Sequence, residues 1–314
     1  MRLVEINNSM NLILLLYPVS IIVIVIFYVV LYMCFHNIYG IILCFFSIMK
    51  WISIKPIIAW INNLIYERYK DDFDRIKQNI RETFIVKGNM TNTKQAIYLL
   101  HPHGVCSLTH AFHINTEFTN WPYRNVYSIV SHIIDKVFPF AFDFINDSNR
   151  MITSVYSSIK GALLDGKSTS MCLGNFTEGQ YDDEHRITVI VKKRKGIFKI
   201  AIETGVPIIP VLSYGEQSVF KKDNTSIISK IVYNLTGIQW SLPDIDGIIK
   251  WMKIFKTPLN NKVVTYIGDP IEVGEARTPT SIEIDELRNK YMDALRKLYK
   301  DTKPVNYEDE IVFV

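Results

Sequence analysis

Two histidines separated by one proline, His101 and His103, are the residues in this sequence best suited to chemistry. They follow residues 96–100, a short, apolar and uncharged segment typical of a buried strand. Proline favours extended backbone in the residue before it, so both histidines are expected to face the same way at the strand's carboxyl end. Histidine has an unperturbed pKa of about 6.5 and can supply a neutral base at cellular pH. Gly104 then allows a tight turn.

A metal-dependent hydrolase is an alternative enzyme class, because His101, His103, His110 and His113 crowd one segment and H-x-H opens several metal sites. A catalytic zinc site also needs supporting carboxylates, and no later motif supplies them, so we expect no metal. A serine hydrolase is disfavoured because the sequence has no G-x-S-x-G elbow.

A second organised site is expected further along the chain. Residues 171–173 read as a strand that runs into GNFTEGQ, a loop carrying Gly174 and Glu178. The basic run of Lys192, Lys193, Arg194 and Lys195 precedes a predicted helix over residues 197–204, and Lys199 follows one turn later. Helix N-termini favour anions, so this run suits a phosphorylated ligand. A solvated basic face or a contact with anionic lipid is the alternative.

The N-terminal segment predicts a membrane anchor. Residues 11–49 contain no Asp, Glu, Lys or Arg, and this stretch is longer than the roughly 20 residues that one spanning helix needs. Polar interruptions near His36 favour a hairpin within residues 1–55, and the stretch is too long for a cleavable signal peptide. Lys50 and Lys55 follow it, so both ends of the hairpin are expected in the cytosol.

The fold class predicted for the rest of the chain is α/β. Residues 56–95 read as an amphipathic helix, on the membrane surface or packed on the soluble core, and a polar connection. From residue 96 to 303 short apolar runs alternate with helical patterns, as in βαβ units, and residues 304–314 form a tail. The predicted strands are 96–100, 127–130, 171–173, 187–191, 208–212 and 263–267, and the predicted helices are 105–113, 157–164 and 197–204.

The last predicted helix opens with a capping box, Thr280 and Glu283. Its apolar stripe of Leu287, Tyr291, Leu295 and Leu298 is interpreted as core. The four cysteines show no disulfide or zinc spacing. A formal net charge of +4 and the absence of a groove-reading module argue against nucleic acid as a partner.

These motifs together resemble one enzyme family. RKGIFKIAIETGVPIIPVLSYGEQSVFKK, residues 194–222, is similar to the signature block of the type 2 diacylglycerol acyltransferase family, which includes monoacylglycerol and wax ester acyltransferases. HPHG is that family's active-site motif. The order also matches: an N-terminal hairpin, HPHG, GNFTEG, the RKG block, GDPI and a terminal YMDALRKLY helix. The similarity is good over residues 96–301 and weak over 223–261.

The resemblance implies a membrane hairpin followed by a glycerolipid acyltransferase-like α/β domain. It implies acyl transfer from acyl-CoA, a co-substrate, to a neutral lipid hydroxyl in the bilayer, with no further cofactor. Diacylglycerol is the favoured acceptor, and monoacylglycerol and fatty alcohol are the alternatives. The implied location is the endoplasmic reticulum or a host endomembrane, with the catalytic domain in the cytosol. A homo-oligomer is left open, and a non-catalytic lipid-binding protein is a third interpretation.

The family also implies roles for individual residues. His103 is the general base beside His101, and amides near Gly104 hold the oxyanion. Gly174 and Glu178 belong to the supporting loop. The residues that bind the coenzyme A phosphates are Lys192, Lys193, Arg194, Lys195, Gly196 and Lys199. Three positions depart from the patterns of the family or of the wider glycerolipid acyltransferase group. Asn175 replaces a second glycine, Leu108 stands where an Asp would orient His103, and SVYSS replaces an Arg that binds an acceptor's phosphate. The last departure fits a neutral acceptor.

Overall fold

The structure is a computed structural model of the 314-residue chain. It describes residues 70–88, 94–105, 107–115, 119–123, 125–131, 151–181, 183, 185–219, 222–223, 242–243, 249 and 253–314. The chain divides into two units, residues 1–75 with 133–149 and residues 76–132 with 150–314, and nearly all described residues belong to the second. The predicted hairpin and the amphipathic helix after it lie outside the described residues. Within the described ranges, no helix is both long and apolar enough to cross a membrane.

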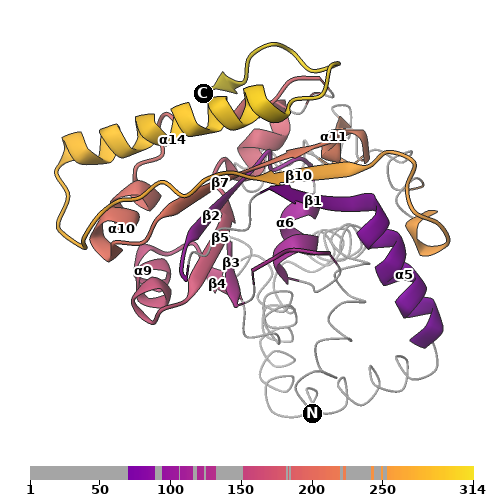
Figure 1. Cartoon of the computed structure of the whole chain (residues 1–314), viewed down its shortest axis with the longest axis horizontal. Coiled ribbons are helices and arrows are strands. Elements are labelled where there is room, and N and C mark those ends of the chain that lie inside the picture. Colours follow the sequence, from indigo (N-terminus) through magenta and orange to yellow (C-terminus); the bar gives the residue numbers. More distant parts are fainter. Residues whose placement is uncertain are drawn as a thin grey trace, which may run out of the picture. The chain divides into compact units, whose positions relative to one another are not determined.

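A seven-stranded sheet forms the centre of the second unit, with β2 in the middle of it (Figure 1). The strand order is β1-β10-β7-β2-β5-β3-β4. β2 pairs in parallel with both β5 and β7, so the carboxyl ends of these three strands meet at one edge. β10 runs antiparallel to β7. The bounds are β1 Phe84–Gly88, β2 Ile97–His101, β3 Val126–Val130, β4 Met151–Thr153, β5 Ser168–Cys172, β7 Ile208–Tyr214 and β10 Val263–Ile267.

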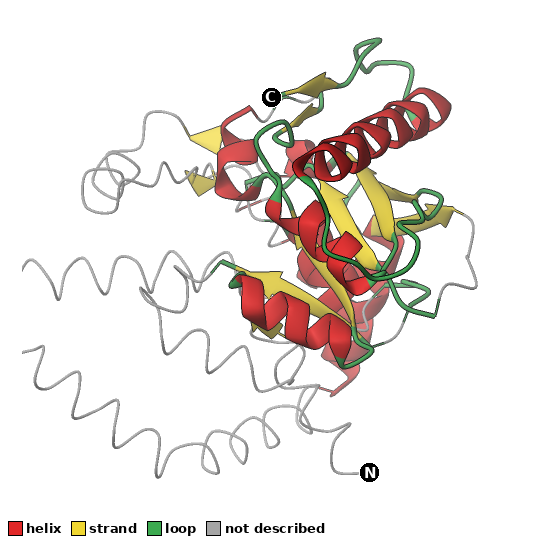
Figure 2. Ribbon diagram, turned by 90° about the vertical axis from the view of Figure 1, so that its left-hand side faces the viewer, coloured by secondary structure: helices red, strands yellow, loops and turns green. Residues whose placement is uncertain are grey.

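Helices cover both faces of the sheet (Figure 2), and every residue of β2 is buried as a result. On one face, Ile97 and Leu99 join a core cluster that includes residues of α9, α10 and α14. On the other face, Tyr98 and Leu100 pack in a cluster with Ile114. The bounds are α5 Lys70–Thr83, α6 Leu108–His110, η1 Ala111–Asn115, α9 Tyr156–Leu164, η3 Asn175–Tyr181, α10 Gly196–Thr204, α11 Glu216–Val219, η4 Lys253–Phe255 and α14 Ser281–Thr302.

The predicted α/β class is confirmed, together with the buried strand before HPHG. The capping box at the start of α14 is also present, because the Thr280 hydroxyl accepts from the Glu283 amide at 3.2 Å and the Glu283 carboxylate accepts from the Thr280 amide at 2.8 Å. α10 and β7 form where their apolar patterns predicted them.

Three predicted elements differ from the structure. The polar connection of residues 66–94 was expected to contain some helix, which α5 supplies, but it also contains β1, an unpredicted strand that pairs with β10 at the edge of the sheet. The helix expected from residue 105 begins only at Leu108, because Ser107 adopts a left-handed conformation with φ 50°. The run 187–191 supplies β6, Thr188–Val189, which pairs with β11, Val312–Phe313, and not with the main sheet. Its side chains are apolar because they fill the α14 side of the core.

Candidate active site

His101 ends β2 and is fully buried, with both ring nitrogens engaged. Its Nδ1 lies 3.0 Å from Glu178 Oε1, and its Nε2 lies 2.8 Å from the Tyr291 hydroxyl. A carboxylate only accepts, so Nδ1 donates to Glu178. Burial raises the pKa of the Tyr291 phenol well above its usual range, so the phenol keeps its proton. His101 is therefore held in a fixed orientation by partners at both ring nitrogens.

Glu178 connects three segments of the site. Its Oε2 accepts from the His103 amide at 2.8 Å, and its Oε1 accepts from His101 and from the Ile190 amide at 3.0 Å. The residue lies in η3, a 3-10 helix, where the sequence predicted a loop. A Cβ at Gly174 would overlap the Glu178 carboxylate, so the first glycine of the supporting loop is required whether or not a second follows it. One carboxylate thus fixes HPHG, GNFTEG and the segment before the basic run.

His103 has the geometry of a neutral base. Its Nδ1 lies 2.8 Å from the Gly104 carbonyl oxygen, which can only accept, so Nδ1 carries the proton. In the neutral ring the lone pair is then on Nε2. Burial lowers the pKa of His103, and the Gly104 carbonyl and the Glu178 charge oppose that shift. The ring is consequently neutral at pH 7 and able to take a proton.

The first backbone amides of the helix after HPHG are not available to bind an oxyanion, although the sequence had suggested that they would be. The amides of Leu108 and Thr109 donate to the two carboxylate oxygens of Glu216, at 2.6 Å and 3.2 Å. These two amides are therefore engaged and cannot hold an oxyanion while those bonds persist. Gly104 lies in the turn before them with φ +61°, a conformation that disfavours side chains.

The four crowded histidines do not converge as metal ligands. His110 contacts the hydroxyls of Ser170 and Ser128 at 3.0 Å and 3.2 Å. His113 contacts the hydroxyls of Thr119 and Thr265, each at 2.9 Å. In the described part of the chain, no three His, Cys, Asp or Glu side chains gather as a metal-binding group.

The basic run lies at the N-terminus of α10, as predicted, but its members differ. Lys192 and Lys193 are exposed, whereas Lys195 forms an ion pair with Asp285 at 3.0 Å. Lys199 lies 3.6 Å from Glu203 and packs over the Tyr156 ring. The Nε atom of Arg194 is buried without a hydrogen-bond partner among the described residues. Gly196 is the exposed first residue of α10.

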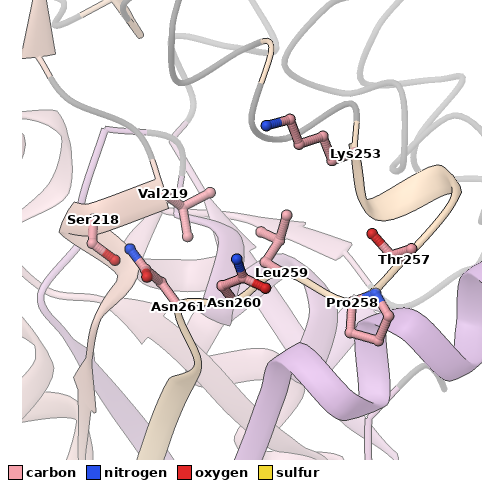
Figure 3. Close-up of a pocket in the computed structure, with 8 residues that line it drawn as sticks. All are labelled: Ser218, Val219, Lys253, Thr257, Pro258, Leu259, Asn260 and Asn261. Carbon is pink, nitrogen blue, oxygen red and sulfur yellow. The ribbon is translucent and has the colours of Figure 1, made fainter.

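A pocket of about 230 Å³ lies beside α11 and the start of β10 (Figure 3). Ser218 and Asn261 lie close together on one side of it, and Lys253 reaches in from another. A second pocket of about 380 Å³ shares Ser218 and Asn261 with the first. The lining of the first pocket combines polar side chains with three apolar ones, Val219, Pro258 and Leu259.

Sequence reasoning missed two residues of this arrangement. The stripe of α14 was interpreted as core alone, yet Tyr291, at its centre, holds His101. Glu216 stands in the SYGEQ turn and carried no motif role, yet it is buried beside HPHG. A polar tip on an otherwise apolar helix face was the one available signal for Tyr291.

A family model and related sequences indicate one enzyme family. A family model described as diacylglycerol acyltransferase matches residues 59–312. "Diacylglycerol O-acyltransferase 2" of Dictyostelium discoideum is 27% identical over 257 residues, which cover 78% of this chain and 76% of that protein. "2-acylglycerol O-acyltransferase 1" of Bos taurus is 25% identical over 260 residues, 78% of this chain and 74% of that protein. A solved 1-acyl-sn-glycerophosphate acyltransferase from Thermotoga maritima aligns with a TM-score of 0.44 and 15% identity, covering 94% of this chain and 97% of that one.

Proposed function

Because the chain belongs to the diacylglycerol acyltransferase family, we propose that it transfers a fatty acyl group from acyl-CoA to the hydroxyl of a neutral lipid. Diacylglycerol is the favoured acceptor and triacylglycerol the product, as the name of the Dictyostelium relative supports. Monoacylglycerol is the second candidate acceptor, since the bovine relative is named for 2-acylglycerol. A fatty alcohol is the third.

The Glu178 carboxylate is the observation that carries this proposal. It is buried and accepts from the His101 ring, the His103 amide and the Ile190 amide, so the motif histidines and the chain leading to the basic run are held together. Ligands of parallel sheets bind at the carboxyl ends of the strands, which is where β2 and β5 deliver these groups. The base and the segment that leads to the basic run are thus held by one carboxylate.

The reaction follows from the state of His103. Its Nε2 accepts the proton of the acceptor's hydroxyl as the oxygen attacks the thioester carbonyl. The negative charge of Glu178 favours the imidazolium that forms. Collapse of the tetrahedral intermediate forms the ester and releases coenzyme A as a thiolate, which recovers the proton from His103 directly or through water. The Gly104 amide is the candidate donor to the oxyanion.

The basic run is assigned to the phosphates of acyl-CoA. Two exposed lysines, the positive charge of the half-buried Arg194 and the N-terminus of α10 together provide donors and positive charge. Lys195 and Lys199 contribute less because carboxylates already pair with them.

Neutralising the exposed lysines tests this assignment. The variant Lys192→Gln/Lys193→Gln should raise the KM for acyl-CoA several-fold and leave the KM for the acceptor unchanged, because phosphate contacts bind the donor alone. Steady-state kinetics with each substrate varied in turn measures both constants. Lys297→Gln/Lys300→Gln, which removes two exposed charges from α14, is the matched control. If the two variants had the same KM for acyl-CoA, the basic run would be a surface patch without a role in donor binding.

Tyr291→Phe should lower kcat by about tenfold, because His101 loses the hydroxyl partner that fixes its ring and the residues around His103 loosen. The control is Tyr299→Phe on the same helix, which removes a buried hydroxyl that donates to the Glu308 carbonyl at 2.7 Å. Both changes should cost about 1 kcal/mol of unfolding free energy, so thermal unfolding separates stability from activity. Equal kcat values for Tyr291→Phe and Tyr299→Phe would show that the Tyr291 hydroxyl has no specific role in catalysis.

The acceptor is identified by a panel. Microsomes containing the protein receive labelled acyl-CoA with diacylglycerol, monoacylglycerol, fatty alcohol or sterol, and the labelled ester is measured for each. The expected result is the highest kcat/KM with diacylglycerol. A preference for fatty alcohol would reassign the protein as a wax ester synthase, and no ester with any acceptor would contradict the proposed function.

The membrane placement is also part of the proposal. The uncharged stretch 11–49 is long enough for a hairpin that would bring the site to an acceptor insoluble in water. The lysines after it favour a cytosolic location for the catalytic part. Glycosylation of Asn175 in a microsomal assay would show a luminal domain and contradict this orientation.

A further inference from the structure

Glu216 is a buried carboxylate that the reaction described above does not use. It lies two residues after the end of β7 and is the first residue of α11. β7 is the parallel neighbour of β2, so the side chain reaches the carboxyl end of the strand that carries HPHG. Only 2% of the residue is exposed.

Glu216 caps a helix that has no cap of its own. Its Oε1 accepts from the Leu108 amide at 2.6 Å, and its Oε2 accepts from the Thr109 amide at 3.2 Å and the Thr109 hydroxyl at 2.6 Å. Ser107, the N-cap residue of α6, makes no side-chain cap hydrogen bond. The first amides of a helix need acceptors, so the glutamate from β7 replaces the local cap.

The same carboxylate limits where Gly104 can lie. A Cβ built on Gly104 would approach Glu216 Oε1 to 2.8 Å, and a Cβ built on Gly179 would approach the Gly104 carbonyl oxygen to 2.7 Å. Gly104 therefore lies between the Glu216 side chain and the η3 backbone. Its carbonyl accepts from His103 Nδ1, so the position of this one peptide sets the tautomer of His103.

We propose that Glu216 is a positioning residue for the base: its carboxylate holds the turn between β2 and α6 so that the Gly104 carbonyl keeps His103 with Nδ1 protonated and Nε2 ready to accept. This inference rests on the proposed function, in which His103 is the base. The three donors that the structure places on Glu216 are neutral, so within the described residues the cost of burying this charge is met by hydrogen bonds and not by a cation. A costly buried charge beside a reactive group is typical of functional sites.

The ionisation of Glu216 gives the inference a specific readout. Burial raises the pKa of its carboxyl to about 7, and the Leu108 and Thr109 bonds oppose this rise. Protonation turns one acceptor oxygen of Glu216 into a donor and breaks its hydrogen bonds to the Leu108 and Thr109 amides. We therefore expect kcat to fall as the pH drops through about 7. Cys172 on β5 is a further titratable group whose pKa Glu216 affects, and burial keeps that thiol protonated. The pKa of His103 lies below that of Glu216. The acid limb of the pH profile, the fall in kcat at low pH, that protonation of His103 causes is therefore expected at lower pH.

The test compares Glu216→Gln, Thr109→Val and Thr109→Ser in the full chain, with kcat and both KM values measured from pH 5.5 to 9. Glu216→Gln should lower kcat at pH 8.5 by about 10- to 100-fold, because the base is displaced, with the donor KM nearly unchanged. Its acid limb near pH 7 should disappear. Thr109→Val removes a bond that lowers the Glu216 pKa, so the limb should move to higher pH, whereas Thr109→Ser should keep the wild-type profile.

Wild-type kcat and an unchanged limb in Glu216→Gln would overturn the inference. If Glu216→Gln does not fold, Thr109→Val provides the test. An acid limb at the wild-type pH in Thr109→Val would also overturn the inference. His103→Gln is assayed beside them. Activity retained in His103→Gln would contradict the proposed function, whereas an inactive His103→Gln with a wild-type Glu216→Gln would contradict the role of Glu216 alone.

Discussion

His103→Gln should lower kcat by about 10²- to 10⁴-fold, the range that a general base typically contributes. Glutamine keeps hydrogen-bonding capacity but cannot take a proton near neutral pH, so the variant isolates proton transfer. Nδ1 donates to the Gly104 carbonyl in the wild type, and the glutamine amide can make a similar bond. Initial rates with saturating acyl-CoA and acceptor, at equal amounts of membrane-inserted protein, provide the measurement.

Two variants calibrate this result. His185→Gln changes an exposed histidine elsewhere in the same unit and should keep full activity. His101→Gln should cost less than His103→Gln, because both nitrogens of His101 are engaged with Glu178 and Tyr291 and only orientation is lost. If His103→Gln retains more than about a tenth of wild-type kcat, less loss than any general base predicts, His103 is not the base.

Glu178→Gln should also abolish most activity, and it should lower stability as well. The carboxylate accepts three hydrogen bonds, from the His101 ring and from two backbone amides. An amide side chain offers one oxygen and turns its NH₂ group towards a donor, which leaves at least one buried donor unsatisfied. That costs about 1–3 kcal/mol of unfolding free energy. Thermal unfolding and kcat measured on the same preparation give both effects.

Glu203→Gln is the matched control for Glu178. Glu203 lies on α10 and pairs with Lys160 at 2.7 Å. Its loss breaks the ion pairs with Lys160 and Lys199 and the contact with the Tyr156 hydroxyl without touching the histidines, so the control should retain kcat. Wild-type kcat in Glu178→Gln would separate the carboxylate from catalysis and leave it a purely structural role.

The motifs could be predicted from sequence because their signals are local. An uncharged apolar run before HPHG predicts a buried strand, and Thr280 with Glu283 predicts a capping box, since both patterns depend on residues a few positions apart. The polarity of residues 66–94 concealed β1, because an edge strand needs fewer buried side chains than a central one.

The contacts of the site could not be predicted in the same way. His101 and Tyr291 are 190 residues apart, and the tyrosine occupies a helix position that core packing alone explains. Glu216 stands in a tight turn after a strand, where a polar residue is ordinary. Only the pairing of β7 with β2 places it against the first turn after HPHG. Such contacts depend on the strand order, which local patterns do not encode.

The most direct test of the central claim is the balance between coenzyme A released and ester formed. Purified protein in vesicles containing diacylglycerol receives labelled acyl-CoA, and free thiol, labelled triacylglycerol and labelled fatty acid are measured together. We predict equal amounts of coenzyme A and triacylglycerol, with neither formed by His103→Gln. Coenzyme A release matched by free fatty acid, and not by triacylglycerol, would show hydrolysis and contradict acyl transfer.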